Sequence, residues 1–167
     1  YVYKRQDDQH LEDEIAYYCG YISGFELKRT GIDINFSPVV DLSSKSNVLN
    51  SRTFSKNPEA IFRLASRYIM GHIDNGIIPV LKHFPGHGAV LSDTHTTISE
   101  CDFEYDELSP HVEPFKQLYN KFKIPIMNYS NCRGMRSLDS LSLCSSLIAN
   151  IVKVLLGLLS LITAFFH

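Results

Sequence analysis

The sequence predicts an α/β fold made of parallel strand–helix units, part of a (β/α)8 TIM barrel. Segments with helical periodicity alternate with short apolar runs that are typical of buried parallel strands. Polar residues follow three of these runs, namely Asp41, Lys82–His83 and Asn128–Ser130, as at the carboxyl face of a barrel. A doubly wound sheet is the alternative, but its usual Gly-rich phosphate fingerprint is missing. Because a complete barrel takes about 250 residues, a chain of 167 residues predicts a partial barrel.

The first predicted elements are a helix over residues 8–29, which ends at Thr30–Gly31, and a strand within residues 32–42, which ends at Asp41. A polar loop over residues 43–55 follows the strand. The helix is predicted to be amphipathic because apolar side chains recur along it every three or four residues. These side chains are Leu11, Ile15, Tyr18, Ile22 and Phe25.

The second predicted helix begins at Asn57–Pro58–Glu59, where Asn is a good N-cap and Pro a good first helical residue. Asn75–Gly76 ends it, and an apolar run over residues 77–82 predicts the next strand. A third helix is entered near Pro110 or kinked at Pro114. Its apolar face is Phe115, Leu118, Tyr119 and Phe122, and that of the second helix is Ile61, Leu64, Ala65, Tyr68 and Ile69. A strand over residues 124–127 and a helix over residues 141–155 complete the pattern.

Composition excludes some functions. A net charge of −2 with dispersed lysines and arginines argues against a nucleic-acid partner. The four cysteines lie far apart, which predicts reduced thiols in a cytoplasmic protein. Residues 1–14 are polar and predict no signal peptide, while Tyr1 at the start suggests that an upstream part is absent.

The end of the chain is different in character. Residues 147–166 form an apolar run of about twenty residues, enough to cross a bilayer, although Lys153 lies within it. A membrane anchor is therefore one interpretation. The other, which we prefer, is a partial barrel domain over residues 1–156 followed by an aberrant apolar tail over residues 157–167.

The segment from Lys82 to His95 is the candidate site, because titratable side chains crowd there on a loop after a strand. Asp93 lies two residues before His95, so its carboxylate can hold the imidazole in one tautomer and make it a proton shuttle. A solvated pair of loop residues is the plainer reading of Asp93 and His95. His83 and His87 have the spacing of a zinc-binding helix, but Pro85 and Gly86 between them exclude that helix. We therefore expect no metal and no organic cofactor.

Four motifs occur in one order and together resemble the N-acetyl-β-glucosaminidase branch of glycoside hydrolase family 3. The loop motif is Lys-His-Phe-Pro-Gly-His-Gly at residues 82–88, and Asp-Thr-His at residues 93–95 follows it. Upstream stand Asn-Phe-Ser-Pro-Val-Val-Asp-Leu at residues 35–42 and Ser-Arg-Thr-Phe-Ser at residues 51–55, the latter followed by Asn-Pro-Glu at residues 57–59. The similarity covers roughly residues 8–155.

The resemblance implies a (β/α)8 barrel that hydrolyses terminal β-linked N-acetylglucosamine with retention, in the recycling of cell-wall muropeptides (peptidoglycan turnover). It makes His95 the general acid/base and Asp93 its orienting partner, with Thr94 where the family has Ser. It also implies that the carbohydrate substrate contacts four further residues, Asp41, Arg52, Lys82 and His83. The sequence predicts no oligomeric state.

The sequence departs from the family's pattern at the catalytic nucleophile. In the family it is an aspartate in a Thr-Asp-Asp-like motif, whereas no aspartate follows Asp139 here. A truncated or frameshifted gene product, inactive by itself, is the resulting hypothesis, since a retaining mechanism needs this carboxylate. Two alternatives stay open, a non-catalytic sugar-binding remnant and a membrane-anchored remnant.

Overall fold

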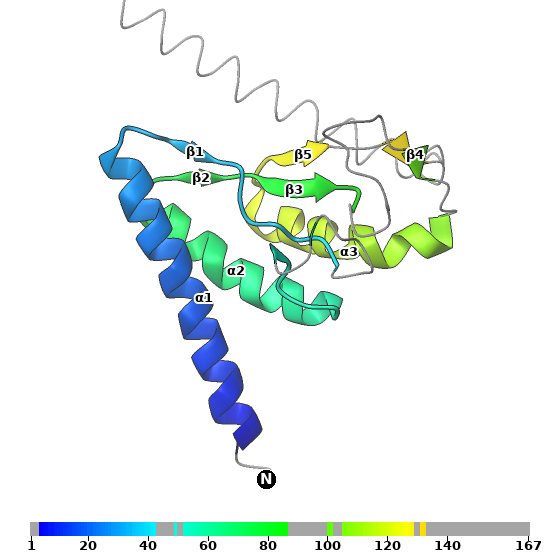
Figure 1. The fold of residues 1–167 in the computed structure, drawn as a ribbon, viewed down its shortest axis with the longest axis horizontal. Helices are drawn as coiled ribbons and strands as arrows, with labels where there is room; N and C mark the ends of the chain where they lie inside the picture. The colour runs from blue at the N-terminus through cyan, green and yellow to red at the C-terminus, as the bar shows by residue number, and fades with distance from the viewer. Residues whose placement is uncertain are drawn as a thin grey trace, which may run out of the picture.

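The structure is a computed structural model that describes residues 4–42, 49, 52–86, 100–101, 105–128 and 131–132 (Figure 1). Within these residues helices and short strands alternate along the chain, as predicted. The helices are α1 (Lys4–Arg29), α2 (Pro58–Asp74) and α3 (Tyr105–Phe122). The strands are β1 (Ile34–Asn35), β2 (Ile78–Pro79), β3 (Leu81–Phe84), β4 (Glu100–Cys101), β5 (Ile126–Asn128) and β6 (Asn131–Cys132).

The described strands pair in parallel. β1 pairs with β2, β3 pairs with β5, and β4 pairs with β6. A further parallel bridge joins Val39 to Lys82, so the chain after β1 continues along β3. Figure 1 shows β3 and β5 side by side, with α2 and α3 beneath them. Parallel strands joined through helices are the arrangement that the sequence predicted.

The strands are shorter than predicted, and several boundaries differ. Only two residues of the predicted strand over 32–42 form β1. Val39, later in the same run, makes an isolated bridge outside any strand. The run over 77–82 is split into β2 and β3, which extends to Phe84. α3 begins before Pro110 and contains both prolines, so the prediction of an entry near Pro110 is wrong. β4 and β6 had no prediction, and the predicted helix over 141–155 lies outside the described residues.

α2 begins and ends as its sequence predicts. The Asn57 Oδ1 atom accepts a hydrogen bond from the Glu59 backbone N–H at 2.9 Å, which satisfies one of the unpaired donors of the first turn. Gly76 follows the helix with a φ of 69°, a conformation that glycine adopts without strain. On the core face Ile61, Ala65 and Ile69 are buried, as predicted.

One core packs α2 and α3 against the strands. Phe84 of β3 meets Phe115 of α3 edge-to-face, with ring centroids 5.4 Å apart, a favourable aromatic geometry. The buried side chains of this core are Val40, Leu42, Ile61, Ala65, Ile69, Leu81, Phe84, Phe115, Leu118, Ile124 and Ile126. This packing fixes the end of β3, where the candidate site begins.

α1 packs on α2 with a face other than the predicted one. At Gly20 of α1 and Gly71 of α2, an added Cβ would overlap backbone atoms of the other helix, so the two backbones touch. Arg63 of α2 also pairs with Glu12 and Asp13 of α1. The apolar stripe from Leu11 to Phe25 lies exposed instead. Periodicity correctly predicted the helix, but the glycines Gly20 and Gly71, and not the predicted apolar stripe, bring its backbone against α2.

None of the described helices is both long and apolar enough to cross a membrane. The run over 147–166 lies outside the described residues, so the anchor interpretation stays untested, as do the predicted domain limits at residues 156 and 157.

Candidate functional site

The site begins at β3, in which Lys82 and His83 are the two middle residues. Backbone hydrogen bonds place the segment after β1 beside this strand: Lys82 N donates to Pro38 O at 3.2 Å, and Val40 N donates to Lys82 O at 2.9 Å. Asp41 therefore lies next to His83, although the two are 42 positions apart in the sequence.

Asp41 and His83 form a buried pair. The side chain of Asp41 is fully buried and His83 is 4% exposed. The Asp41 Oδ2 atom accepts the His83 backbone N–H at 2.9 Å and lies 2.9 Å from His83 Nδ1. A carboxylate accepts, so Nδ1 carries the proton in this pair, and the ring is held in one orientation.

Lys82 is half-buried beside this pair. Burial and then the positive charge of Arg52 lower the pKa of Lys82 below its ordinary value, and the Asp41 carboxylate acts in the opposite direction. Because the charges of Arg52 and Asp41 both affect the pKa of Lys82, the three side chains lie near one another. The Lys82 ammonium donates hydrogen bonds, whereas a histidine ring with its proton on Nδ1 can only accept at Nε2. Sugar hydroxyl groups both donate and accept, so the two residue types suit them.

Arg52 reaches the site from an exposed position. Its backbone N–H donates to Leu49 O at 2.8 Å, and the Leu49 side chain is buried. The buried leucine anchors the turn that carries the guanidinium, while the guanidinium itself stays accessible.

His111 is a site residue that the sequence reasoning missed. It lies on α3, one turn before the buried Phe115. A Cβ placed on Gly86 would lie 2.8 Å from His111 Cβ, so the imidazole stands directly over the chain where it leaves β3. Burial lowers the pKa of His111, and the Asp41 carboxylate opposes that shift. The signal in the sequence that could have identified His111 is its position on the apolar face of a predicted helix.

The predicted proton-transfer residues, Asp93 and His95, lie outside the described residues, as does His87. Four of the six predicted site residues are described, and the structure brings Asp41, Lys82 and His83 together with Arg52 nearby. No group of three His, Cys, Asp or Glu side chains suited to a metal occurs among the described residues. The expected absence of a metal stays a prediction.

Comparisons with known proteins give the family. The model of the glycosyl hydrolase family 3 N-terminal domain matches residues 6–149. A Beta-hexosaminidase of Idiomarina loihiensis is 40% identical over 103 residues, which are 61% of this chain and 31% of that protein. The chain thus spans about a third of the length of the curated relatives that it matches.

Two solved structures share the fold. NagZ from Neisseria gonorrhoeae in complex with N-trifluoroacetyl-D-glucosamine has a TM-score of 0.71 at 31% identity, over 79% of this chain and 39% of that one. Native NagZ from the same organism has a TM-score of 0.68 at 32% identity, over 74% and 37% of the two chains. These neighbours are barrels of alternating strands and helices, which confirms the predicted fold class of a partial (β/α)8 barrel. The chain therefore belongs to glycosyl hydrolase family 3, as part of the N-terminal barrel domain of that family.

Proposed function

We propose that this chain carries the sugar-recognition part of a β-N-acetylglucosaminidase site, in which Asp41, Arg52, Lys82 and His83 contact a terminal N-acetylglucosamine. The buried pair of Asp41 and His83 carries the proposal, because the Asp41 carboxylate, held by the His83 backbone N–H at 2.9 Å, lies 2.9 Å from Nδ1 and pre-orients the ring. A pre-oriented ring nitrogen accepts a hydrogen bond from a sugar hydroxyl without first losing rotamer freedom. The N-acylated glucosamine bound in a NagZ structure supports the same sugar class.

Asp41 is the wrong carboxylate for a nucleophile. It is fully buried, and His83 already occupies its Oδ2 atom with two contacts. We therefore assign Asp41 to positioning His83. In the proposed retaining reaction His95 is the general acid/base and Asp93 orients it, so that the leaving oxygen takes a proton from His95 and a water later returns one.

The covalent step needs a second carboxylate as nucleophile. Residues 140–167 contain neither Asp nor Glu. We propose that the 167-residue chain by itself binds the sugar and does not hydrolyse it, and that hydrolysis belongs to a complete site. Cell-wall muropeptides as substrates, and a cytoplasmic location, belong to the same proposal.

Calorimetric titration of the chain with N-acetylglucosamine tests the recognition step. We expect saturable binding that is weakened about tenfold or more in Lys82→Met, because a single charge-assisted hydrogen bond contributes about 1.5–3 kcal/mol. Lys56→Met is the matched control, since Lys56 is exposed and belongs to none of the contacts of the site. An absence of saturable heat, or an equal loss in both variants, would reject the proposal.

The catalytic part has its own assay. Release of p-nitrophenol from its N-acetyl-β-glucosaminide should stay at the background rate for the 167-residue chain. Turnover that is lost in His95→Ala would show that a carboxylate other than the family's aspartate serves as nucleophile.

A further inference from the structure

The residues that follow Lys82 form a tight turn, His83–Gly86, called the site turn below. The Gly86 backbone N–H donates to the His83 carbonyl at 2.9 Å, which closes a turn of four residues. All four residues are buried. The His83 backbone N–H donates to Asp41 at 2.9 Å. Both backbone polar groups of His83 therefore make hydrogen bonds, and whatever fixes Gly86 also fixes the carbonyl end of His83.

α3 contacts the site turn at two points. The Phe115 ring meets Phe84, the second residue of the turn, with ring centroids 5.4 Å apart. One helical turn earlier, His111 lies against Gly86. A Cβ placed on Gly86 would lie 2.8 Å from His111 Cβ and 3.4 Å from its Cγ and Nδ1 atoms. Residues four positions apart share a helix face, so the two rings reach the turn from one face of α3.

The contact with His111 leaves the site turn little freedom. Gly86 has a φ of 136°, which only glycine adopts readily, and His111 fills the space where a side chain at residue 86 would lie. The hydrogen bond to His83 closes the turn from within, and the imidazole of His111 confines it from outside.

The His111 ring is neutral at pH 7. Burial lowers its pKa, and the Asp41 carboxylate acts in the opposite direction. Because the ordinary pKa of histidine is about 6.5, the ring carries no charge at neutral pH. It therefore packs against Gly86 as a flat apolar surface, without a positive charge that would draw the Asp41 carboxylate away from His83.

We propose that His111 is a positioning residue of the sugar site, whose imidazole packs against Gly86, holds the site turn and thereby keeps the His83 ring in its binding orientation. Asp41 holds His83 at its backbone N–H and ring, and His111 holds it through the turn that follows. His111 acts through Gly86 and needs no contact of its own with the sugar.

Nuclear magnetic resonance of the ring nitrogens tests the proposal on the 167-residue chain, because the two ring nitrogens distinguish the Nδ1–H from the Nε2–H tautomer. We expect the unaltered chain to show the Nδ1–H pattern for His83. In His111→Ala the pattern should move toward a mixture of tautomers. Calorimetric affinity for N-acetylglucosamine should fall about threefold or more, since a ring that is correctly oriented for part of the time binds in proportion. His111→Phe keeps a flat ring against Gly86 and should retain both the pattern and the affinity.

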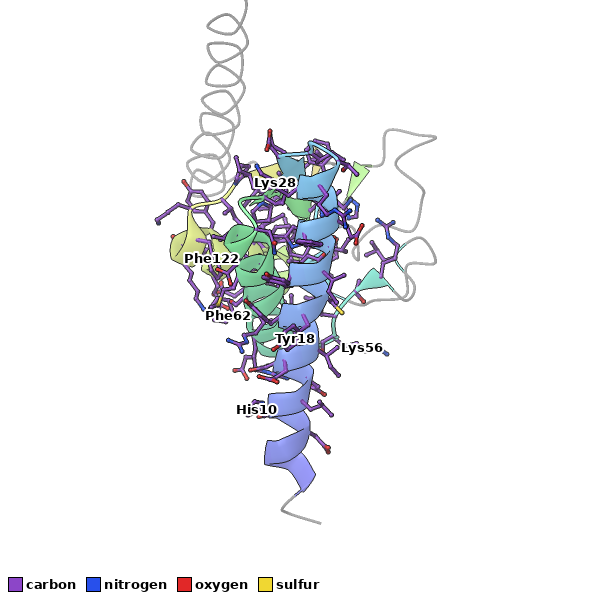
Figure 2. The ribbon with its side chains drawn as sticks, turned by 90° about the vertical axis from the view of Figure 1, so that its left-hand side faces the viewer. His10, Tyr18, Lys28, Lys56, Phe62 and Phe122 are labelled. Atoms are coloured by element: carbon purple, nitrogen blue, oxygen red, sulfur yellow. The ribbon has the colours of Figure 1, made fainter. Side chains whose placement is uncertain are left out.

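The matched control is Phe122→Ala. Phe122 is another half-buried ring of α3, about 16 Å further along the helix axis than His111 at the usual rise per residue. It lies near Phe62 of α2, since Lys121 Nζ is 5.0 Å from the centroid of the Phe122 ring and 5.3 Å from that of Phe62 (Figure 2). Its removal should cost stability but leave the His83 pattern and the affinity unchanged.

Circular dichroism confirms the helix content of each variant, and His111→Val takes the place of His111→Ala if the alanine variant unfolds. An unchanged His83 pattern or affinity in His111→Ala, an equal change in Phe122→Ala, or a failure of His111→Phe to retain the pattern would overturn the proposal.

The affinity measurement rests on the proposed function, whereas the tautomer pattern is read without sugar. If the unaltered chain gives no saturable heat but the variants show the expected patterns, the proposed function fails and the positioning role stands.

Discussion

Replacing Asp41 by alanine tests the buried pair most sharply. The carboxylate is fully buried and satisfies two donors of His83, the backbone N–H and the ring Nδ1–H. Each buried donor left without a partner costs about 1–3 kcal/mol. We therefore expect Asp41→Ala to lower the free energy of unfolding by about 2–6 kcal/mol, a large share of an ordinary domain's stability. Asp41→Asn should lower the free energy of unfolding by less, because its amide oxygen can still accept a hydrogen bond from His83.

Asp33→Ala is the control for this prediction. Asp33 also makes a charged contact, to Lys28 Nζ at 2.7 Å, but these side chains are 60 and 50% exposed. An exposed ion pair contributes about 0–1 kcal/mol. Urea unfolding followed by circular dichroism measures the three variants. If Asp41→Ala and Asp33→Ala cost the same within about 1 kcal/mol, the carboxylate does not satisfy buried donors and the description of the pair is wrong.

Three further predictions concern stability. Gly86→Ala should destabilise more than Gly31→Ala, since both have positive φ but only the Gly86 Cβ would meet His111, at 2.8 Å; equal urea midpoints would contradict the contact. Burial lowers the pKa of His72 in the folded chain, so the unfolded chain binds a proton more readily and stability should fall as the pH drops below about 6.5. That loss should be smaller in His72→Gln, and an unchanged pH profile would refute the assignment. Asn57→Ala removes the N-cap of α2 and should cost about 0.5–2 kcal/mol in thermal unfolding, whereas no change would show that the cap is dispensable.

Local signals in the sequence predicted the helices well. The Asn-Pro-Glu signal starts α2 where expected because its cap is satisfied within three residues of chain. The apolar spacing over residues 8–29 likewise predicted α1. It did not predict which face of α1 packs on α2. That contact depends on Gly20 meeting Gly71, and glycines carry no hydrophobic signal.

The sequence predicted which residues belong to the site, but not which of them contact one another. A polar residue at the end of a strand predicted Asp41, Lys82 and His83 one by one. That Asp41 holds His83 follows from parallel pairing across 42 positions, which periodicity alone does not specify. His111 was missed because it lies on a helix face whose apolar residues predict burial in the core. Only the packing of α3 on the end of β3 places it over Gly86.

The most direct test of the central claim is nuclear magnetic resonance of the histidine rings during a titration with N-acetylglucosamine. The His83 ring at the proposed site gives the signal. The reference is His72, which is also buried but whose Nε2 atom lies 2.9 Å from Nδ2 of Asn35 in β1. The account predicts a saturable shift of the His83 ring with His72 unchanged. No shift of His83, or equal shifts of both rings, would contradict it.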